Sequence, residues 1–432
     1  MSAPPITQKA ALRIWLQIAA LSFGGPVGQI AIIQRIVVEE HRLISQEQLL
    51  RALNFCMVLP GPEAQQLVTY IGWMLHGVRG GLTAGLLFIL PGFLSILALS
   101  LAYYHFAAHP NLQAAFWGMK ATILAIIIIA LGRIALKILQ EKILFVLSGM
   151  AFVAIFFFRV PFPLIILAGG CIGAIGYVIS GTPHTQPPRL QISVSSRQSA
   201  KTLAIWLSIW LLPIGVIIAI FGYDHLFSQI GVFFAKLAMV TFGGAYAVLS
   251  YMAQAAVNDF GWLTPAQMLD GLAMAESTPG PLIQIVQFVG FVAATSQETP
   301  SVLQPVFASI LATWVTFAPC FLWIFLGAPY MEFLQSFGVI AQCLRAITAC
   351  VVGVIANLAL WFSIHVLFGE HVKIQSHGSD FIAPIWTSLD PAALGILVLA
   401  LVMSKHVNLF CIIGFGIIAG LVLHGSAIAP VG

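Results

Sequence analysis

The chain carries long apolar runs that are almost free of charge, and these runs limit what it can fold into. Residues 114–136 hold only Lys120 and Arg133 as charged residues, and a helix that crosses a bilayer needs about 20 such residues. Only 7% of the whole chain is charged, against about 25% in soluble proteins. The sequence therefore predicts an all-α polytopic membrane protein. The few basic residues form no run, so no nucleic-acid partner is expected.

Apolar segments follow one another along the whole chain. Counting each as one crossing predicts about thirteen transmembrane segments. They are 10–38, 47–77, 82–104, 114–136, 143–158, 162–179, 203–221, 229–257, 267–294, 303–327, 336–366, 392–404 and 407–424.

The chain contains two copies of one unit. LSFGG at 21–25 returns as VTFGG at 240–244, and PGP at 60–62 returns at 279–281, so positions 22–66 align without a gap onto 241–285. Eleven of these 45 positions are identical. This duplication predicts an N-terminal transporter repeat over 1–180, a linker over 181–202, and a C-terminal repeat over 203–432 with one extra leading span.

The distribution of lysine and arginine gives an orientation. With the N-terminus in the cytoplasm and every segment crossing, nine basic loop residues lie inside and four outside, which agrees with the positive-inside rule. The linker is then cytoplasmic and the C-terminus periplasmic. Equivalent points of the two repeats are separated by seven crossings, an odd number, so the two halves are expected to be inverted.

Both repeats interrupt their apolar segments with glycine and proline. In LPGPEAQQ at 59–66, Pro62 suits the first position of a helix, and the preceding helix must end by Leu59. FGGP at 23–26 has the same character, and the second copies FGGA and TPGP add two more breaks. These motifs are either turns at the membrane surface or helices broken inside the membrane. Their recurrence at identical spacing favours broken helices.

Broken helices at matching positions of inverted repeats indicate the binding site of a transporter. The helix N-termini at four breaks would direct N–H groups and partial positive charge at one place, which suits an anion. The predicted binding residues are those of the breaks with the neighbouring hydroxyls and amides: Ser22, Gly24, Gly25, Pro60, Gly61, Pro62, Gln65, Thr241, Gly243, Gly244, Pro279, Gly280, Pro281 and Gln284.

Four charged residues near the breaks or inside spans are candidates for gating or attraction. Glu63 follows a PGP motif, where the helix dipole favours an acid, so a capping role explains it equally well. Glu276 precedes the other PGP at a helix end that disfavours an acid, which points to a proton carrier or gate. Lys120 and Arg345 occupy corresponding positions of the two repeats and either reach the interface or act as a pair.

Other classes of function find no support in the sequence. There is no HExxH zinc pair and no GxSxG elbow, so an enzyme is not expected. The six cysteines have no metal-ligand spacing and are interpreted as small buried residues. No metal or cofactor is expected. A passive anion channel stays open as an alternative, because a pore can also use helix termini.

The motifs resemble those of the chromate ion transporter family in its long two-domain form. The resemblance rests on FGGPVGQIA at 23–31, LNFCMVLPGPEAQQLVTYIGW at 53–73, FGGAYAVLSYMAQ at 242–254 and GWLTPAQMLDGLAMAESTPGPLIQIVQFVGF at 261–291. It implies a secondary transporter of the bacterial inner membrane that exports chromate and confers chromate resistance. Sulfate is also a tetrahedral dianion, so a transporter of sulfate or another oxyanion is the alternative, with sulfate as competitor or counter-anion. The sequence leaves the oligomeric state open, a homodimer included.

Overall fold

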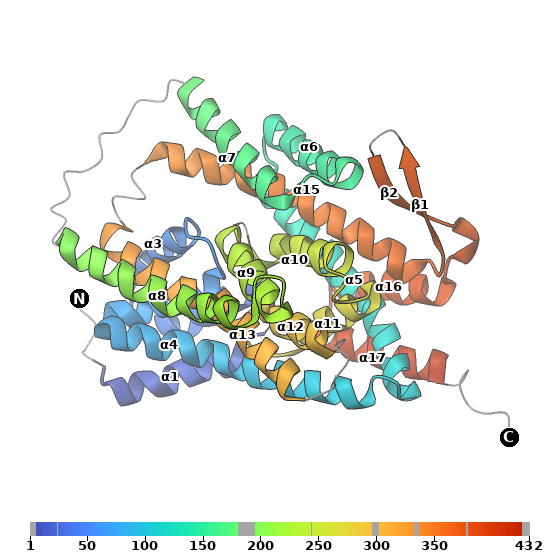
Figure 1. Cartoon of the computed structure of the whole chain (residues 1–432), viewed down its shortest axis with the longest axis horizontal. Helices are drawn as coiled ribbons and strands as arrows, with labels where there is room; N and C mark the ends of the chain where they lie inside the picture. Colours follow the sequence, from blue (N-terminus) through green and yellow to red (C-terminus); the bar gives the residue numbers. More distant parts are fainter. Residues whose placement is uncertain are drawn as a thin grey trace. The chain divides into compact units, whose positions relative to one another are not determined.

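The computed structural model describes residues 6–23, 25–179, 195–242, 244–295, 302–331, 337–376 and 379–425 (Figure 1). Within these residues the chain is almost entirely helical, with a single two-stranded sheet. The described helices that are long and apolar enough to cross a membrane are Glu63–Phe106, Pro110–Ile138, Phe162–Ile179, Ser196–Phe221, Leu303–Tyr330 and Gly338–Leu367. The predicted all-α polytopic membrane fold is confirmed.

The chain forms two compact units, and each combines segments of both sequence halves. Unit 1 comprises Met1–Leu97, Gly170–Val248 and Thr278–Leu344, whereas unit 2 comprises Ala98–Gly169, Leu249–Ser277 and Arg345–Gly432. The predicted repeats over 1–180 and 203–432 are therefore divisions of the sequence, and neither repeat forms a compact unit by itself.

Unit 1 holds most of the helices that flank the FGG and PGP motifs. Its elements are α1 (Gln8–Leu21), α2 (Gly25–Gln34), the π-helix η1 (Arg35–Glu40), α3 (Gln46–Cys56), the greater part of α4 (Glu63–Phe106), α8 (Ser196–Phe221), α9 (Leu226–Met239), the 3₁₀ turn η3 (Leu282–Gln284), α12 (Ile285–Thr295), α13 (Leu303–Gly327) and η4 (Ala328–Tyr330).

Helix α4 consists of two antiparallel arms. His76 and Gly77 leave the helical conformation, and Gly77 has φ +61°. A β-carbon on Gly72 would lie 2.5 Å from the carbonyl oxygen of Gly80, and one on Gly85 would lie 2.4 Å from Thr69 Oγ1. Small residues thus let the arms approach closely, as in other membrane helix pairs. The first arm is the second half of the predicted segment 47–77, whose first half is α3, and the second arm corresponds to the predicted segment 82–104. In the second repeat, α12 packs against α13 in the same manner, with Gly290 against Ala308.

Unit 2 contains the remaining long helices and the β-hairpin. Its elements are the end of α4, α5 (Pro110–Ile138), α6 (Lys142–Phe158), the first part of α7 (Phe162–Ile179), most of α10 (Ala245–Gln254), the π-helix η2 (Ala255–Asp259), α11 (Pro265–Ser277), most of α15 (Gly338–Leu367), the antiparallel strands β1 (His371–Ser376) and β2 (Ser379–Pro384), η5 (Trp386–Ser388), α16 (Pro391–Met403) and α17 (Leu409–Gly425).

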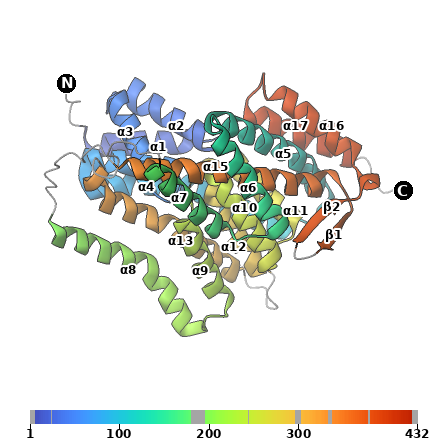
Figure 2. The ribbon, with the colours of Figure 1, turned by 90° about the horizontal axis from the view of Figure 1, so that it is seen from above.

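Helices α16 and α17 pack against α5 within this unit (Figure 2). The contact between α5 and α17 depends on three glycines, because a β-carbon on Gly118 would lie 2.0 Å from the carbonyl oxygen of Gly416 and 2.8 Å from the Cα of Gly420. Gly416 and Gly420 have the GxxxG spacing that permits close contact between membrane helices.

The same local structures recur 219 residues apart. Ser45 and Gln48 form a capping box at the start of α3, and Thr264 and Gln267 exchange the same two hydrogen bonds at the start of α11. The π-helix η1 at the end of α2 likewise has a counterpart in η2 at the end of α10. The second repeat therefore keeps not only the motifs of the first but also its helix starts and irregular turns.

Two details of the expected segments are wrong. Residues 196–202, assigned to the linker, form the first turns of α8, while residues 180–194 lie outside the described residues. The segment 229–257 was expected to cross the membrane once, which would place residue 258 on the opposite face from residue 159. The structure does not agree with this expectation. Arg159 and Asn258 line one cavity of about 250 Å³, whereas the predicted topology placed them on opposite faces of a core about 30 Å thick. The count of thirteen crossings fails at this point because α9 and α10 are separate helices around a break.

The cysteines do not all have the expected burial. Cys56, Cys320 and Cys350 are buried, but Cys171 and Cys411 are exposed on apolar helices.

Candidate functional site

The FGG motifs interrupt the helices in both repeats. α1 ends at Leu21 and α2 begins at Gly25, which has φ +73°. α9 ends at Met239 and α10 begins after Gly244, which has φ +99°. Positive φ is readily available only to glycine, so the second glycine of each motif is required by the backbone. The first glycines, Gly24 and Gly243, lie outside the described residues.

The PGP motifs also separate helices. α3 ends at Cys56 and α4 begins at Glu63, and α11 ends at Ser277 before η3 begins at Leu282. The central glycines, Gly61 and Gly280, have φ +130° and +103°. The helix breaks predicted at all four motifs are therefore present in the structure.

Each PGP break is hydrogen-bonded to the FGG break of the other repeat. The N–H of Gly61 donates to the carbonyl of Thr241 at 2.9 Å, and the N–H of Gly280 donates to the carbonyl of Ser22 at 2.8 Å. Because Gly61 corresponds to Gly280 and Ser22 to Thr241, the two bonds are exchanged by the same repeat operation. This reciprocity is what a pseudo-twofold relation between the breaks produces.

These bonds correct part of the predicted donor set. The N–H groups of Gly61 and Gly280 were expected to face an anion, but they are used between the repeats. The hydroxyls of Ser22 and Thr241 were also expected as donors, and they donate to the carbonyls of Ile18 at 2.6 Å and Leu237 at 2.7 Å, one turn back along their helices. Buried donors pair with a carbonyl when one is within reach, because an unpaired buried N–H or O–H costs about 1–3 kcal/mol.

Two further contacts join the four breaks into one cluster within unit 1. Gln29 Nε2 donates to the carbonyl of Gly280 at 2.5 Å, and a β-carbon on Gly25 would lie 3.8 Å from Tyr246 Oη at the start of α10. The prolines of the motifs, Pro60, Pro62, Pro279 and Pro281, lie at these breaks but have no N–H to donate.

Two glutamines at equivalent positions after the PGP motifs are completely or almost completely buried. Gln65 is 0% exposed and Gln284 is 1% exposed. Gln65 Nε2 donates to Thr69 Oγ1 at 3.2 Å, and Gln284 Nε2 donates to Gln287 Oε1 at 2.7 Å and Thr313 Oγ1 at 3.2 Å. The Oε1 atoms of both have no hydrogen-bond partner among the described residues. Buried side-chain polar atoms are usually paired, so each amide marks a place for a polar ligand or water.

The neighbouring Gln66 has a structural role as well as an unpaired oxygen. Its Nε2 donates to the carbonyl of Pro60 at 2.8 Å, which holds the PGP turn against the first turn of α4, and its Oε1 has no described partner. The first-turn N–H groups of Ala64 and Gln65 make no backbone hydrogen bond to a described residue. The same holds for Leu282 and Ile283 after the second PGP, as expected for the start of a helix.

The four charged candidates lie in different surroundings. Glu63 is partly exposed in the first turn of α4, while Glu276 is only 2% exposed near the end of α11. Lys120 on α5 forms an ion pair with Asp270 on α11 at 3.0 Å, with side chains only 20% and 8% exposed. Arg345 pairs with Glu141 at the surface, with side chains 40% and 53% exposed. Lys120 and Arg345 therefore correspond in sequence but do not share a structural role.

A family model described as chromate transporter matches residues 10–174 and 228–421, one stretch in each predicted half. The chain belongs to the chromate transporter family. The second stretch begins after residues 203–221.

Several curated relatives of this family align over most of the chain. A chromate transport protein of Pseudomonas aeruginosa is 34% identical over 67% of this chain and 68% of its own length. A probable chromate transport protein of Synechococcus elongatus is 28% identical over 82% and 84%, and a chromate transport protein of Cupriavidus metallidurans is 26% identical over 83% of both chains. No solved structure matches the chain significantly.

In this family member, Asp270 and Tyr103 are site candidates that the sequence analysis missed. Tyr103 Oη donates to Asp270 Oδ2 at 2.9 Å, so the buried carboxylate contacts both Tyr103 and Lys120. The signal was available, because Asp270 is an ionisable residue inside a predicted span, and such residues are expensive in a membrane and commonly functional. Gln29 and Gln66 were missed for another reason: their contacts with the breaks follow from packing and have no sequence signature.

Proposed function

We propose that this chain is a secondary transporter that exports chromate across the bacterial inner membrane and thereby confers chromate resistance. Membership of the chromate transporter family supports the substrate, and so do the names of its relatives. The repeated helix breaks support alternating access, because irregular backbone at membrane depth is tolerated where it lines a cavity or is buried in protein. The enzyme alternative has no supporting site in the sequence.

The proposed binding site is based on the two buried glutamines. Gln65 and Gln284 correspond in the two repeats, and both keep an amide oxygen without a described partner. Rotation of either amide by 180° about its last bond places the NH₂ group where the unpaired oxygen now stands. At Gln284 this requires the amide of Gln287 to rotate as well, so that its NH₂ group donates to Gln284 Oε1 and gives up its bond to the carbonyl of Phe93. Two such amides, with the first-turn N–H groups of Ala64, Leu282 and Ile283, offer the neutral donors that a tetrahedral oxyanion needs.

Neutral donors suit transport better than full ion pairs. Hydrogen bonds to a charged group contribute about 1.5–3 kcal/mol each, so a few of them hold a dianion without preventing its release. In this proposal the glycines Gly61 and Gly280 hold the breaks of the two repeats together, and Pro62 and Pro281 fix the chain just before the donor turns. The interlocked breaks then form the rigid part against which the rest of unit 1 moves.

The membrane potential is sufficient to drive export. Moving one charge through 100 mV changes the free energy by about 2.3 kcal/mol, so a dianion that leaves an inside-negative cell gains roughly 4.6 kcal/mol. We therefore expect chromate efflux without obligatory proton coupling.

Purified protein in liposomes tests this function. Labelled chromate should move in the direction set by a valinomycin potential, sulfate should compete if both oxyanions bind, and saturable counterflow should distinguish a transporter from a passive channel. Gln65→Glu and Gln284→Glu place a carboxylate at the proposed site and should abolish chromate binding and transport. Gln113→Glu on an exposed surface of α5 is the matched control.

Three results would count against the proposal. Wild-type chromate affinity in folded Gln65→Glu and Gln284→Glu protein would place the site elsewhere. Transport that ignores the potential but stops without a pH gradient would indicate electroneutral proton exchange. Transport of sulfate with no uptake of chromate would replace chromate as the substrate.

A further inference from the structure

The two repeat-related π-helices carry different side chains, although their backbones are alike. η1 presents Arg35, Glu39 and Glu40, and the corresponding positions at η2 are Gln254, Asn258 and Asp259. π-helical turns occur often at functional sites because they redirect side chains. The side chains of η2 can therefore be compared with those of η1, which has the same backbone conformation.

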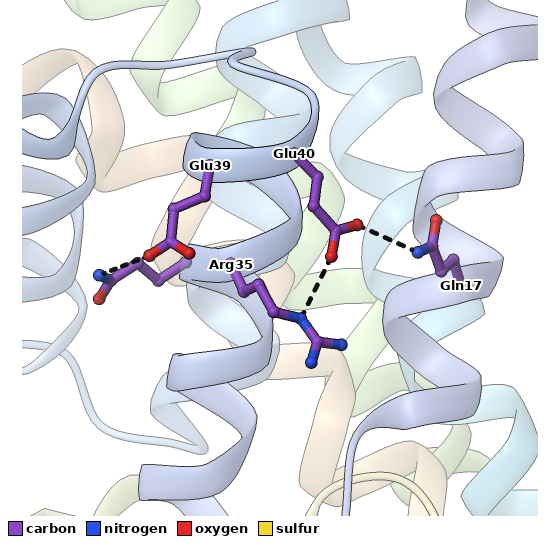
Figure 3. Close-up of polar contacts among 5 residues, drawn as sticks. Gln17, Arg35, Glu39 and Glu40 are labelled. Atoms are coloured by element: carbon purple, nitrogen blue, oxygen red, sulfur yellow. Dashed lines mark hydrogen bonds and ion pairs between the residues drawn. The ribbon is translucent and has the colours of Figure 1, made fainter.

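The polar side chains of the first copy are paired with one another and with neighbours. Arg35 Nε lies 3.2 Å from Glu40 Oε1, and Gln17 Nε2 donates to the other oxygen of Glu40 at 3.4 Å. Figure 3 shows these contacts. The carboxylate of Glu39 accepts a hydrogen bond from Gln34. Arg35 is thus neutralised by Glu40, and the remaining negative charge of Glu39 leaves no place for an anion.

The second copy lines a cavity instead. The cavity has a volume of about 250 Å³ and lies within unit 2, between α6, α10, η2, α15 and the β-hairpin. No side-chain hydrogen bond links Gln254, Asn258 or Asn357 to another described residue, although all three line the cavity. Three amides with free hydrogen-bonding capacity therefore surround the same space.

One cation contributes to the cavity wall. Arg159, at the end of α6 with φ +49°, lines the cavity together with the three amides. Asp259 follows Asn258 on η2; burial raises the pKa of Asp259, and the charge of Arg159 acts in the opposite direction. The guanidinium is thus partly balanced by a nearby carboxylate. Such a site attracts an anion without holding it tightly.

The rest of the wall is apolar and limits the size of a ligand. Ile155, Leu358 and Ile364 line it, and Phe381 of the hairpin also contacts Phe156 of α6 with ring centroids 5.9 Å apart. Pockets for drug-sized ligands measure about 300–1,000 Å³. The cavity is below that range and fits a small ion with part of its hydration shell.

We propose that this cavity is a second oxyanion site, a vestibule in which Arg159 and the amides of Gln254, Asn258 and Asn357 hold a tetrahedral dianion before or after its passage. This proposal rests on the proposed function, which identifies the transported ion as chromate. It is separate from the break site of unit 1, and it assigns a role to the loss of charge at Asn258, where the first repeat has Glu39. The amide of Asn258 in place of the carboxylate of Glu39 removes one negative charge from the cavity wall, while Arg159 supplies the cation that Gln254, in place of Arg35, does not.

Two variants test the vestibule in nanodiscs and liposomes made only of zwitterionic lipid. Arg159→Gln removes the cation, and Asn258→Glu restores the acid that the first repeat carries at this position. Because a hydrogen bond to a charged group contributes about 1.5–3 kcal/mol, both should weaken sulfate binding and raise KM for chromate about tenfold or more, with kcat changed less than about twofold. Arg42→Gln, at another exposed arginine with φ +49°, should change neither.

The readouts separate the vestibule from the proposed function. If the wild-type protein does not transport chromate, the proposed function fails, but calorimetric titration with sulfate still tests the cavity. Equal sulfate affinity in the wild type and in folded Arg159→Gln and Asn258→Glu protein overturns the vestibule. If Arg159→Gln instead loses only bound phosphatidylglycerol, and sulfate binding is unchanged, the cavity holds a lipid headgroup and the proposal also falls.

Discussion

The ion pair between Lys120 and Asp270 should be the most sensitive polar contact of unit 2. The two charged atoms are 3.0 Å apart, and the side chains are 20% and 8% exposed. Lys120 Nζ forms an ion pair with Asp270 Oδ1, but the geometry does not make a hydrogen bond. Tyr103 Oη donates a hydrogen bond to the second carboxylate oxygen of Asp270. Replacement of Asp270 by asparagine keeps the shape of the side chain and leaves the charge of Lys120 without its partner.

The expected loss follows from this geometry. At an effective dielectric constant of about 20, unit charges 3.0 Å apart attract each other by roughly 5.5 kcal/mol. Breaking a buried pair by removing one partner costs about 3–5 kcal/mol, whereas removing both partners is often nearly neutral. We therefore expect Asp270→Asn to lower the free energy of unfolding by about 4 kcal/mol, and the double variant Asp270→Asn with Lys120→Met to recover most of this loss.

Unfolding of the purified protein by SDS in mixed micelles, followed by tryptophan fluorescence, measures these changes. Glu141→Gln provides the matched control, because it breaks the ion pair with Arg345 in the same unit but at 40% and 53% exposure, and an exposed pair contributes less than about 1 kcal/mol. A loss below about 1 kcal/mol for Asp270→Asn, or a double variant as unstable as the sum of the two single variants, would refute the reasoning.

Three further predictions concern the breaks and the topology. Gly61→Ala should destabilise the protein by about 2 kcal/mol more than Gly222→Ala in the same unfolding assay, because both have positive φ but only Gly61 has atoms within 3 Å of the new β-carbon. Equal losses would show that the close packing of Gln66 and Cys320 around Gly61 is unimportant. Glu276→Gln should change the pH dependence or turnover of transport more than Glu63→Gln, since Glu276 is buried at a helix end that disfavours acids; identical pH profiles for both variants contradict this. In a cysteine-free background, a cysteine at Tyr223 should react with an impermeant reagent in intact cells and one at Ser195 should not, because α8 separates them. The opposite pattern reverses the orientation expected from the lysine and arginine distribution, in which the linker is cytoplasmic.

Features of the fold that depend only on neighbouring residues could be read from the amino-acid sequence. Proline and glycine set backbone dihedral angles locally, so the four breaks could be located from FGG and PGP without any knowledge of the fold. Low charge and apolar runs imposed a helical membrane protein, because lipid cannot satisfy an open backbone.

Which distant groups contact each other depends on how the helices pack. The N–H of Gly61 finds the carbonyl of Thr241, and Asp270 finds Lys120, across stretches of chain that no periodicity connects. Neither sequence half forms a compact unit, since each unit combines segments of both. Local chemistry fixes where a helix ends, but the partner of a freed N–H group or of a buried charge depends on how all the helices pack. The donors predicted at the breaks were therefore partly wrong, although the breaks themselves were predicted correctly.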